Sequence, residues 1–210
     1  MLWITAGIIA SYLTGSIPTA FIFAKTMKGI DIRKHGSGNV GATNALRVLG
    51  TGPGIACLAI DVLKGLLPVI ILGPLVQHKT GLRPDVVLIT MGLSCICGHI
   101  WTVFLDFKGG KGIATSLGVL IGLAIAIRGL GIILLLLILC WLAIFLATRI
   151  VSISSVAGAA LLPVLMAVFG QSKVLICSSL ILSLFAIYKH KENIKRFLQG
   201  TEKKISFKKT

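Results

Sequence analysis

Seven long apolar segments with almost no charge are the feature that most limits how this chain can fold. They run over Leu2 to Ala24, Gly54 to Val76, Val86 to Leu105, Ile113 to Ile127, Leu130 to Ala147, Val156 to Phe169 and Val174 to Tyr188. Each holds roughly 15 to 23 residues, and about 20 residues of helix span a bilayer. Only 13% of the chain is charged, against about 25% in soluble domains. The sequence predicts an all-α integral membrane protein with five to seven spanning helices, seven being the preferred count.

The stretch GSGNVG at residues 36 to 41 matches the dinucleotide-binding pattern G-x-G-x-x-G, and Asp61 follows it in the position of a ribose-binding acid. That pattern works only between a strand and a helix of a parallel sheet. The apolar segments here do not alternate in polarity, and backbone in hydrocarbon must satisfy its own hydrogen bonds, which favours helices. We therefore place GSGNVG in a loop between two membrane helices and predict no nicotinamide cofactor.

Basic residues outnumber acidic ones by 21 to 6, which gives a formal net charge of +15. With the N-terminus outside and seven spans, 16 basic residues fall on the inner side of the membrane and four on the outer side. This bias predicts a cytoplasmic C-terminus, with residues 189–210 as a basic cytoplasmic tail of a single membrane-embedded domain, 1–210. Short re-entrant or interfacial helices are expected in the cytoplasmic loops. Nucleic acid is not an expected partner, because no aromatic platform accompanies the basic residues.

The five cysteines all lie in apolar segments, so we expect them to pack as small hydrophobic side chains rather than form disulfides. Cys95, Cys97 and His99 suggest a metal site, but residues two apart on a helix point to different sides. Neither a metal nor another cofactor is expected. His99 is interpreted as a core histidine, or at most as a residue that acts from behind a site. Asp61 is expected to pair with Lys64, one turn along the same helix.

The first of four polar clusters on the predicted cytoplasmic side is HGSGNVGATNALRVLG, residues 35 to 50. Its glycines, Gly36, Gly38 and Gly41, would permit positive φ and close approach of the backbone. Residues 42–49 are expected to form a short helix closed by Gly50, and a glycine-rich turn before a helix N-terminus suits an anion. The alternative is an interhelical turn with one arginine on a lipid phosphate. The candidate binding side chains are Ser37, Asn39, Thr43, Asn44 and Arg47.

The second cluster is FKGGKGIAT, residues 107 to 115, at the start of the fourth predicted helix. It lacks the spacing of a Walker A motif, because Leu105 and Gly112 stand where the first glycine and the Ser/Thr should be. Adjacent glycines at a helix start would expose amide groups to an anion between two lysines. We predict phosphate binding without nucleotide hydrolysis, against the alternative of a plain basic loop. The candidates are Lys108, Gly109, Gly110, Lys111 and Gly112.

The remaining clusters have strong alternatives. SISS, residues 152 to 155, includes Ser155 and begins the sixth predicted helix, where serines could merely cap the N-terminus. HKENIKRFLQGTE, residues 190 to 202, brings His190 and Asn193 to one helix face. Its alternative is an amphipathic interfacial helix, with Ile194 and Phe197 toward lipid and Lys195 and Arg196 toward headgroups. Helices two, four and six begin at the cytoplasmic face, so their dipoles and the basic loops would form a site for one or two phosphates.

These clusters resemble, in order and wording, those of the bacterial acyl-phosphate:glycerol-3-phosphate acyltransferase family, the membrane-integral PlsY family. The resemblance implies a seven-helix fold in the cell (inner) membrane with its site facing the cytoplasm. It also implies transfer of a fatty acyl group from acyl phosphate to the 1-hydroxyl of glycerol 3-phosphate, giving lysophosphatidic acid and inorganic phosphate, the first step of phospholipid synthesis. The motifs that carry it are GSIP (15–18), GSGNVGATNALR (36–47), DVLKG (61–65), GH (98–99), FKGGKGIAT (107–115), VSISS (151–155) and HKENIKRFLQGTE (190–202).

By motif position, the resemblance assigns a catalytic set and a set of substrate-phosphate-binding residues. It implies no metal and no cofactor. The implied partners are a fatty acyl phosphate, glycerol 3-phosphate and the lipid bilayer, with docking of an acyl-phosphate-producing enzyme left open. The catalytic set is Ser37, Arg47, Lys111, His190 and Asn193; the binding set is Gly36, Gly38, Asn39, Gly41, Thr43, Asn44, Lys108, Gly109, Gly110, Gly112 and Ser155.

An acyl phosphate is a mixed anhydride and already activated, so we expect the glycerol hydroxyl to attack it directly, with positioning and charge stabilisation supplying the rate. The hydroxyl proton would go to the donor's own phosphate or to His190, and the sequence favours neither. The competing function is a membrane carrier for an organic phosphate. Carriers place their sites near the bilayer midplane between repeats, whereas the polar residues here collect at one face and no repeat is visible.

Overall fold

The computed structural model describes residues 1–205, which are helical with short connections and contain no strand in that range. The all-α prediction is confirmed for this part of the chain, and the dinucleotide-binding alternative has no sheet to support it. The chain divides into two compact units, Met1–Ile127 and Arg128–Thr210, which are described separately below. The basic-tail prediction falls partly on residues 206–210, which lie outside the described residues.

The first apolar segment is interrupted. Helix α1 (Leu2–Ser16) ends before Ile17 and Pro18, and α2 (Thr19–Lys28) begins after them. Proline has no amide hydrogen and keeps the preceding residue out of the α conformation, and Ile17 accordingly has ψ 112°. The expected single helix over residues 2–24 is therefore two helices with a break at this dipeptide.

The second apolar segment is continuous but irregular. It consists of α4 (Thr51–Leu67), the π-helical turn η2 (Pro68–Leu72) and α5 (Gly73–Thr80). Pro68 cannot donate a helical hydrogen bond, and the backbone widens there so that the Gly73 N–H donates to the Pro68 carbonyl. The connection from α2 to α4 contains η1 (Ile32–Lys34) and α3 (Ala42–Leu49).

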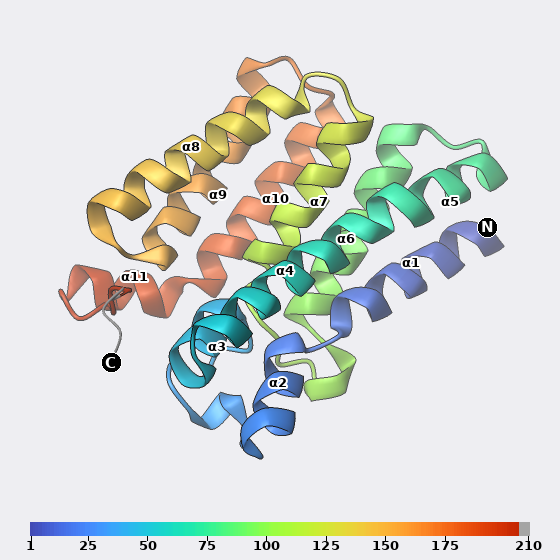
Figure 1. Ribbon diagram of the computed structural model, residues 1–210. Helices are drawn as coiled ribbons and strands as arrows, with labels where there is room; N and C mark the ends of the chain where they lie inside the picture. Colours follow the sequence, from blue (N-terminus) through green and yellow to red (C-terminus); the bar gives the residue numbers. More distant parts are fainter. Residues whose placement is uncertain (206–210) are drawn as a thin grey trace. The chain divides into compact units, whose positions relative to one another are not determined.

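The first unit is completed by α6 (Pro84–Ile100), the short turn η3 (Val103–Leu105) and α7 (Ile113–Ala126). Within it α1 packs along α6 and α4 along α7, as Figure 1 shows. Glycines permit the close approach: a Cβ on Gly15 would lie 1.9 Å from the Cys95 carbonyl oxygen, and one on Gly118 would lie 1.9 Å from that of Val62. Membrane helices commonly pack through such small residues, because lipid provides no hydrophobic force between helices.

The second unit contains α8 (Leu130–Thr148), α9 (Val151–Val168), α10 (Lys173–Lys189) and α11 (Lys191–Leu198). Helix α9 contacts both α8 and α10 (Figure 1). The short helix α11 follows α10 at a bend of 57°.

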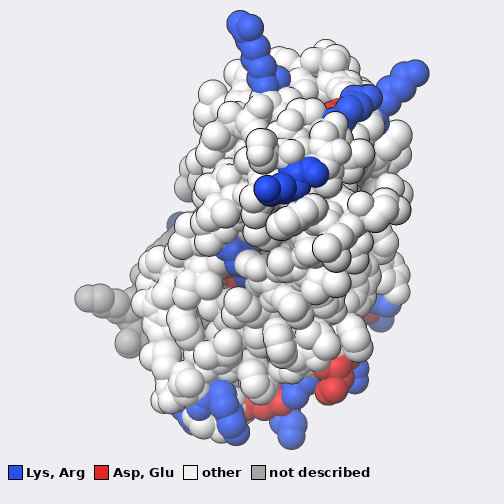
Figure 2. Space-filling model, turned by 90° about the vertical axis from the view of Figure 1, so that its right-hand side faces the viewer, with Lys and Arg blue, Asp and Glu red and all other residues white. Residues whose placement is uncertain are grey.

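All seven predicted apolar segments are mostly helical in the described residues, with breaks at Ile17–Pro18 in the first and at Trp101–Thr102 in the third. Five helical segments there are long and apolar enough to cross a membrane, and a sixth qualifies if α10 and α11 form one bent span. Helix α7 is apolar but has only 14 residues. On the face drawn in Figure 2, Lys and Arg side chains are scattered and few, and most of the visible surface is uncharged. This distribution fits a membrane-embedded protein.

Candidate functional site

The glycine-rich loop of the first cluster is held in shape by Asn44. Helix α3 begins at Ala42 and ends at Leu49 as predicted, and its Asn44 side chain is buried beneath the loop. Asn44 Oδ1 accepts the Ser37 N–H at 2.8 Å, and Asn44 Nδ2 donates to the His35 carbonyl at 3.0 Å and the Ile32 carbonyl at 3.4 Å. Because these bonds occupy the amide, the structure favours a loop-shaping role for Asn44 over the predicted contact with a phosphate.

Two of the three loop glycines have the predicted backbone conformation. Gly36 has φ 66° and Gly38 has φ 72°, values that side chains with a Cβ rarely adopt. Gly41 differs, because its φ of −154° is ordinary extended backbone at the start of α3. The expectation of positive φ at Gly41 is wrong.

The remaining candidates of this cluster lie on the surface of the loop and of α3. Ser37 and Arg47 are exposed, whereas Asn39 and Thr43 are half-buried. Thr43 and Arg47 are one helical turn apart, so they share a face of α3. The loop held by Asn44 and the helix α3 that follows it thus present hydroxyl, amide and guanidinium groups together. This set of groups suits recognition of a phosphate.

The second loop is docked on the end of α6 rather than opened toward an anion. The Gly109 N–H donates to the Ile100 carbonyl at 3.1 Å, and the Gly110 N–H donates to the His99 carbonyl at 3.0 Å. The prediction that these two glycines expose their amide groups is therefore wrong. Glycine is needed because the backbones nearly touch: a Cβ on Gly109 would lie 2.0 Å from the His99 carbonyl oxygen.

Gly112 and the two lysines of this loop can still contribute to binding an anion. Gly112 has φ 82° and immediately precedes α7, which starts at Ile113 as predicted. Lys111 beside it is half-buried, and Lys108 is exposed. The docked glycines thus fix the backbone from which the two lysines project.

Gly110 brings the two loops of the first unit together. A Cβ at this position would lie 2.2 Å from His99 Nε2 and 2.8 Å from the carbonyl oxygen of Val40, which belongs to the first loop. No local pattern predicts this contact, because Val40 and Gly110 are 70 positions apart in the chain.

Behind the second loop lies a buried ion pair in α4. Lys64 Nζ is 2.7 Å from Asp61 Oδ1, which confirms the predicted pairing, and both side chains are at least 95% buried. Lys64 also donates to the Ile17 carbonyl at 2.9 Å, and the Thr19 hydroxyl donates to Asp61 at 3.0 Å. His99 is a buried histidine as predicted, with Nδ1 3.9 Å from Asp61 Oδ1.

Asp31, an acidic residue that precedes the first loop, is engaged locally. Its carboxylate accepts the Arg33 backbone N–H at 3.0 Å and pairs with the Arg33 guanidinium at 2.8 Å. The side-chain hydrogen bond from Arg33, together with the backbone one, lowers the pKa of Asp31 to about 2. The same bond raises the pKa of Arg33. Asp31 therefore caps η1, and its charge is paired with that of Arg33.

In the second unit, the serines of the third cluster are not N-caps. Helix α9 starts at Val151 with Ile150 as its N-cap, so the serines lie within its first turns. Ser154 donates to the Ile150 carbonyl at 3.0 Å and Ser155 to the Val151 carbonyl at 2.8 Å. The Ser155 hydroxyl also accepts the Trp141 indole N–H at 3.3 Å. The capping alternative is therefore wrong, because these hydroxyls bond backward to carbonyls rather than to amides.

Glu202 organises the fourth cluster, a role that the sequence did not reveal. Its carboxylate accepts from Asn193 Nδ2, from the Ser152 hydroxyl at 2.7 Å and from Arg196 Nε at 2.7 Å. Burial of the Glu202 carboxyl raises its pKa, but the hydrogen bonds from Asn193, Ser152 and Arg196 outweigh that effect and lower it. A charged carboxylate therefore fixes Asn193 and links α11 to the start of α9.

His190 forms the N-cap of α11 and is buried. Its Nδ1 lies 2.7 Å from the Ala186 carbonyl oxygen. A carbonyl can only accept, so Nδ1 carries the hydrogen and Nε2 of the neutral ring carries the lone pair. This tautomer is the one that a proton acceptor acting through Nε2 requires.

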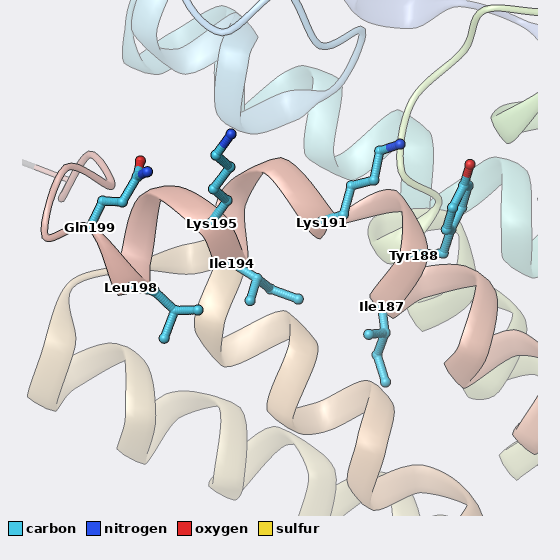
Figure 3. A pocket seen from close by; sticks show the side chains of 7 residues that line it. All are labelled: Ile187, Tyr188, Lys191, Ile194, Lys195, Leu198 and Gln199. Carbon is cyan, nitrogen blue, oxygen red and sulfur yellow. The ribbon is translucent and has the colours of Figure 1, made fainter.

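Helix α11 is amphipathic, as its alternative interpretation expected. A shallow groove of about 520 Å³ runs along it and the end of α10. In Figure 3, Lys191 and Lys195 project to one side of the helix, and Ile194 and Leu198 project to the other. Arg196, however, binds Glu202 rather than pointing toward headgroups. Only part of the expected headgroup-facing charge is therefore available for that purpose.

The helices and the polar loops at their ends define an α-helical integral membrane protein with clustered groups suited to a phosphorylated ligand. The family model of glycerol-3-phosphate acyltransferases matches residues 5–200, and the chain belongs to that family. The resemblance drawn from the motifs is confirmed.

Individual relatives agree over nearly the whole chain. A glycerol-3-phosphate acyltransferase of Geotalea daltonii is 45% identical over 199 residues, covering 93% of this chain and 94% of the relative. One of Desulforamulus reducens is 42% identical, covering 97% and 96%. The crystal structure of PlsY (YgiH), an integral membrane glycerol 3-phosphate acyltransferase in its glycerol 3-phosphate form, has a TM-score of 0.84 at 36% identity, covering 97% of this chain and 96% of that one. Its lysphosphatidic acid form has a TM-score of 0.81.

Proposed function

We propose that this protein transfers a fatty acyl group from an acyl phosphate to the 1-hydroxyl of glycerol 3-phosphate, releasing lysophosphatidic acid and inorganic phosphate. The observation that carries the proposal is the match, over 97% of the chain, to a glycerol 3-phosphate acyltransferase crystallised in its glycerol 3-phosphate and lysphosphatidic acid forms. The acyl phosphate donor is what the resemblance to the acyl-phosphate-dependent family implies, and a mixed anhydride of this kind is already activated for direct attack.

The proposed reaction is a direct displacement. The oxygen of the glycerol hydroxyl forms a bond to the acyl carbonyl carbon, and the bond from that carbon to the phosphate oxygen breaks. The hydroxyl proton leaves with the phosphate or passes to His190. In the first unit, Arg47 and Lys111 are the candidates for holding phosphate groups and stabilising the developing negative charge. Thr43 lies one turn before Arg47 on α3, and Ser37 lies in the loop that precedes this helix.

The residues of the second unit are proposed to act through their hydroxyl, imidazole and amide groups. His190 has the tautomer needed to accept a proton at Nε2, and Asn193 is fixed by Glu202. Ser155 is the candidate phosphate ligand of α9. The predicted binding roles of Asn39, Lys108 and the loop glycines stay predictions. Gly109 and Gly110 would contribute to binding by shaping the loop, not by donating their amide groups to a phosphate.

For the topology we propose seven spans, with the N-terminus outside and the C-terminus in the cytoplasm. Sixteen basic residues then lie on the inner side and four on the outer side, as the positive-inside rule requires. This places both loops of the first unit at the cytoplasmic face of the cell membrane, where glycerol 3-phosphate is available. It also places α11 at the interface, with its Ile194 and Leu198 side toward lipid.

The experiment is phosphate release by the detergent-purified protein supplied with palmitoyl phosphate, with and without glycerol 3-phosphate. Release that needs both substrates, with an equal amount of lysophosphatidic acid formed, is the expected result. Arg47→Ala is expected to abolish it and Arg47→Lys to restore it only weakly, because an ammonium cannot bind a phosphate through two N–H groups. A folded protein that turns over neither palmitoyl phosphate nor acyl-CoA would contradict the proposal and favour an organic phosphate carrier, which uptake into liposomes would then reveal.

A further inference from the structure

A buried ion pair within a membrane-spanning segment needs an explanation. Asp61 and Lys64 lie in the candidate span Thr51–Thr80, with side chains only 2% and 5% exposed. Ionised groups within such segments are costly and mark functional positions in membrane proteins. Stability alone does not explain this pair, because a buried ion pair can often be replaced by apolar residues without loss.

The pair reaches beyond α4 to the break in the first apolar segment. Lys64 donates to the carbonyl of Ile17, and Asp61 accepts from the hydroxyl of Thr19. These residues lie on either side of Pro18, where helical hydrogen bonding is interrupted. The ion pair therefore fixes α4 against the junction of α1 and α2.

On its other side the pair faces His99. Asp61 Oδ1 lies 3.9 Å from His99 Nδ1, and the imidazole is 6% exposed at the last turn of α6. The opposite nitrogen, Nε2, lies against Gly110, where a Cβ would come within 2.2 Å of it. The imidazole thus fills the space between the ion pair and the second loop.

The second loop in turn touches the first. The space at Gly110 is bounded by His99 on one side and by the Val40 carbonyl on the other. Lys111 is the next residue, and Val40 lies three positions after Ser37. Any shift of the imidazole would therefore move the backbone that carries Lys111 relative to the loop that carries Ser37.

We propose that His99 is a positioning residue, oriented by the buried Asp61–Lys64 pair, which sets the Lys111 loop against the Ser37 loop so that phosphate groups are bound in register. The proposal rests on the acyl transfer proposed above. Asp61, Lys64 and His99 do not touch substrate in this scheme. They act through the backbone between Gly109 and Lys111.

The test separates the two sides of the imidazole. In His99→Asn the amide nitrogen takes the place of Nδ1, which keeps a polar group toward Asp61 but empties the space at Gly110. In His99→Gln the amide reaches the position of Nε2 and fills that space. We expect His99→Asn to raise the KM for a phosphate-bearing substrate at least about tenfold, since a misplacement of about 1 Å can cost up to about a hundredfold. His99→Gln should have a KM within about threefold of wild type, because the filled space at Gly110 keeps the loop from being displaced.

The ion pair is tested by removing both charges together. Either single substitution leaves an unpaired buried charge and is expected to impair folding. The double variant Asp61→Asn with Lys64→Met keeps the volume, and it should fold and raise the same KM as His99→Asn. Ser11→Ala is the matched control, since Ser11 is also fully buried in the first unit but bonds only to Met91 in the described contacts.

Thermal unfolding is measured for each variant, and kinetics are recorded well below the lowest midpoint. Unchanged KM values in folded His99→Asn or in the folded double variant would overturn the proposal. So would a loss of activity that follows only the fraction of unfolded protein, because that is what a purely structural role predicts. Failure of the wild-type protein to transfer acyl groups would instead refute the proposed function, which keeps the two results distinct.

Discussion

Asn44 and Ser37 are joined by a hydrogen bond of 2.8 Å in which the buried amide oxygen of α3 accepts the backbone N–H of the exposed loop. The same amide donates back to the carbonyls of His35 and Ile32. A single side chain thereby fixes the conformation of the loop that presents Ser37. The binding groups of this cluster depend on a residue that does not itself need to contact a ligand.

Asn44→Asp tests this dependence. The substitution keeps the shape and the acceptor for Ser37 but replaces the donor to His35 with a carboxylate oxygen. We expect acyl transfer to fall at least about tenfold and the free energy of unfolding to drop by about 1–3 kcal/mol, the usual effect of leaving a buried group without its partner. Steady-state kinetics and thermal unfolding measure the two effects. Full activity with normal stability would mean that the loop does not need this amide.

Gly110→Ala should disturb the contact between the two loops. The added methyl group would lie 2.2 Å from His99 Nε2 and 2.8 Å from the Val40 carbonyl oxygen, so the loop must shift. We expect loss of most acyl transfer with the protein still folded. Gly52→Ala is the control, because Gly52 lies in α4 and a Cβ added to it would meet nothing within 4 Å. The control should retain activity and gain a few tenths to about 1 kcal/mol in stability. Equal activity of the two variants would contradict the packing role of Gly110.

Ser155→Ala and Ser154→Ala form a matched pair on α9. Both serines are buried and both donate to the carbonyl four residues earlier, but only Ser155 accepts the indole N–H of Trp141. If Ser155 binds substrate phosphate, its loss should lower kcat/KM about tenfold, in line with removal of one hydrogen bond to a charged group. Ser154→Ala should remain near wild type. Similar kinetics for both variants would remove Ser155 from the candidate site.

The lowered pKa of the Glu202 carboxyl predicts how the stability of the protein depends on pH. Hydrogen bonds lower its pKa in the folded protein, so its contribution is fully present above the ordinary carboxyl pKa, about 4.3, and is lost as the pH falls through the lower folded value. In wild-type protein, thermal midpoints should fall below about pH 4 for this reason. Glu202→Gln should have a lower midpoint at neutral pH. The gap between the two proteins should narrow on acidification, and a gap that is constant with pH would show that the charge of Glu202 does not matter.

Several features were readable from local sequence because they depend on neighbours in the chain. The limits of α3 follow from a glycine on each side of an eight-residue stretch. The Asp61–Lys64 pair follows from helical spacing. The break at Pro18 was also readable in principle, since proline interrupts helical hydrogen bonding, but the apolar run on both sides concealed it.

The site was predicted less completely, for an equally physical reason. Residue types and glycine patterns identified both loops of the first unit, but not the direction of their amide groups. Gly109 and Gly110 donate to carbonyls at the end of α6, and nothing in the FKGGKG stretch specifies that partner. Glu202 lies in a basic stretch of the chain, and nothing local specifies its three donors, which come from α9 and α11.

The sequence by itself determined that this protein is a bundle of membrane helices with polar, glycine-rich connections. The reason is that each helix in hydrocarbon must satisfy its own backbone hydrogen bonds and be apolar along its length, so each can be recognised from its own residues. Only the tertiary structure decided that Gly110 lies between His99 and Val40, and that Ser152 shares a carboxylate with Asn193. These contacts join residues distant in the chain. They are selected by the packing of whole helices, which leaves no periodic trace in the sequence.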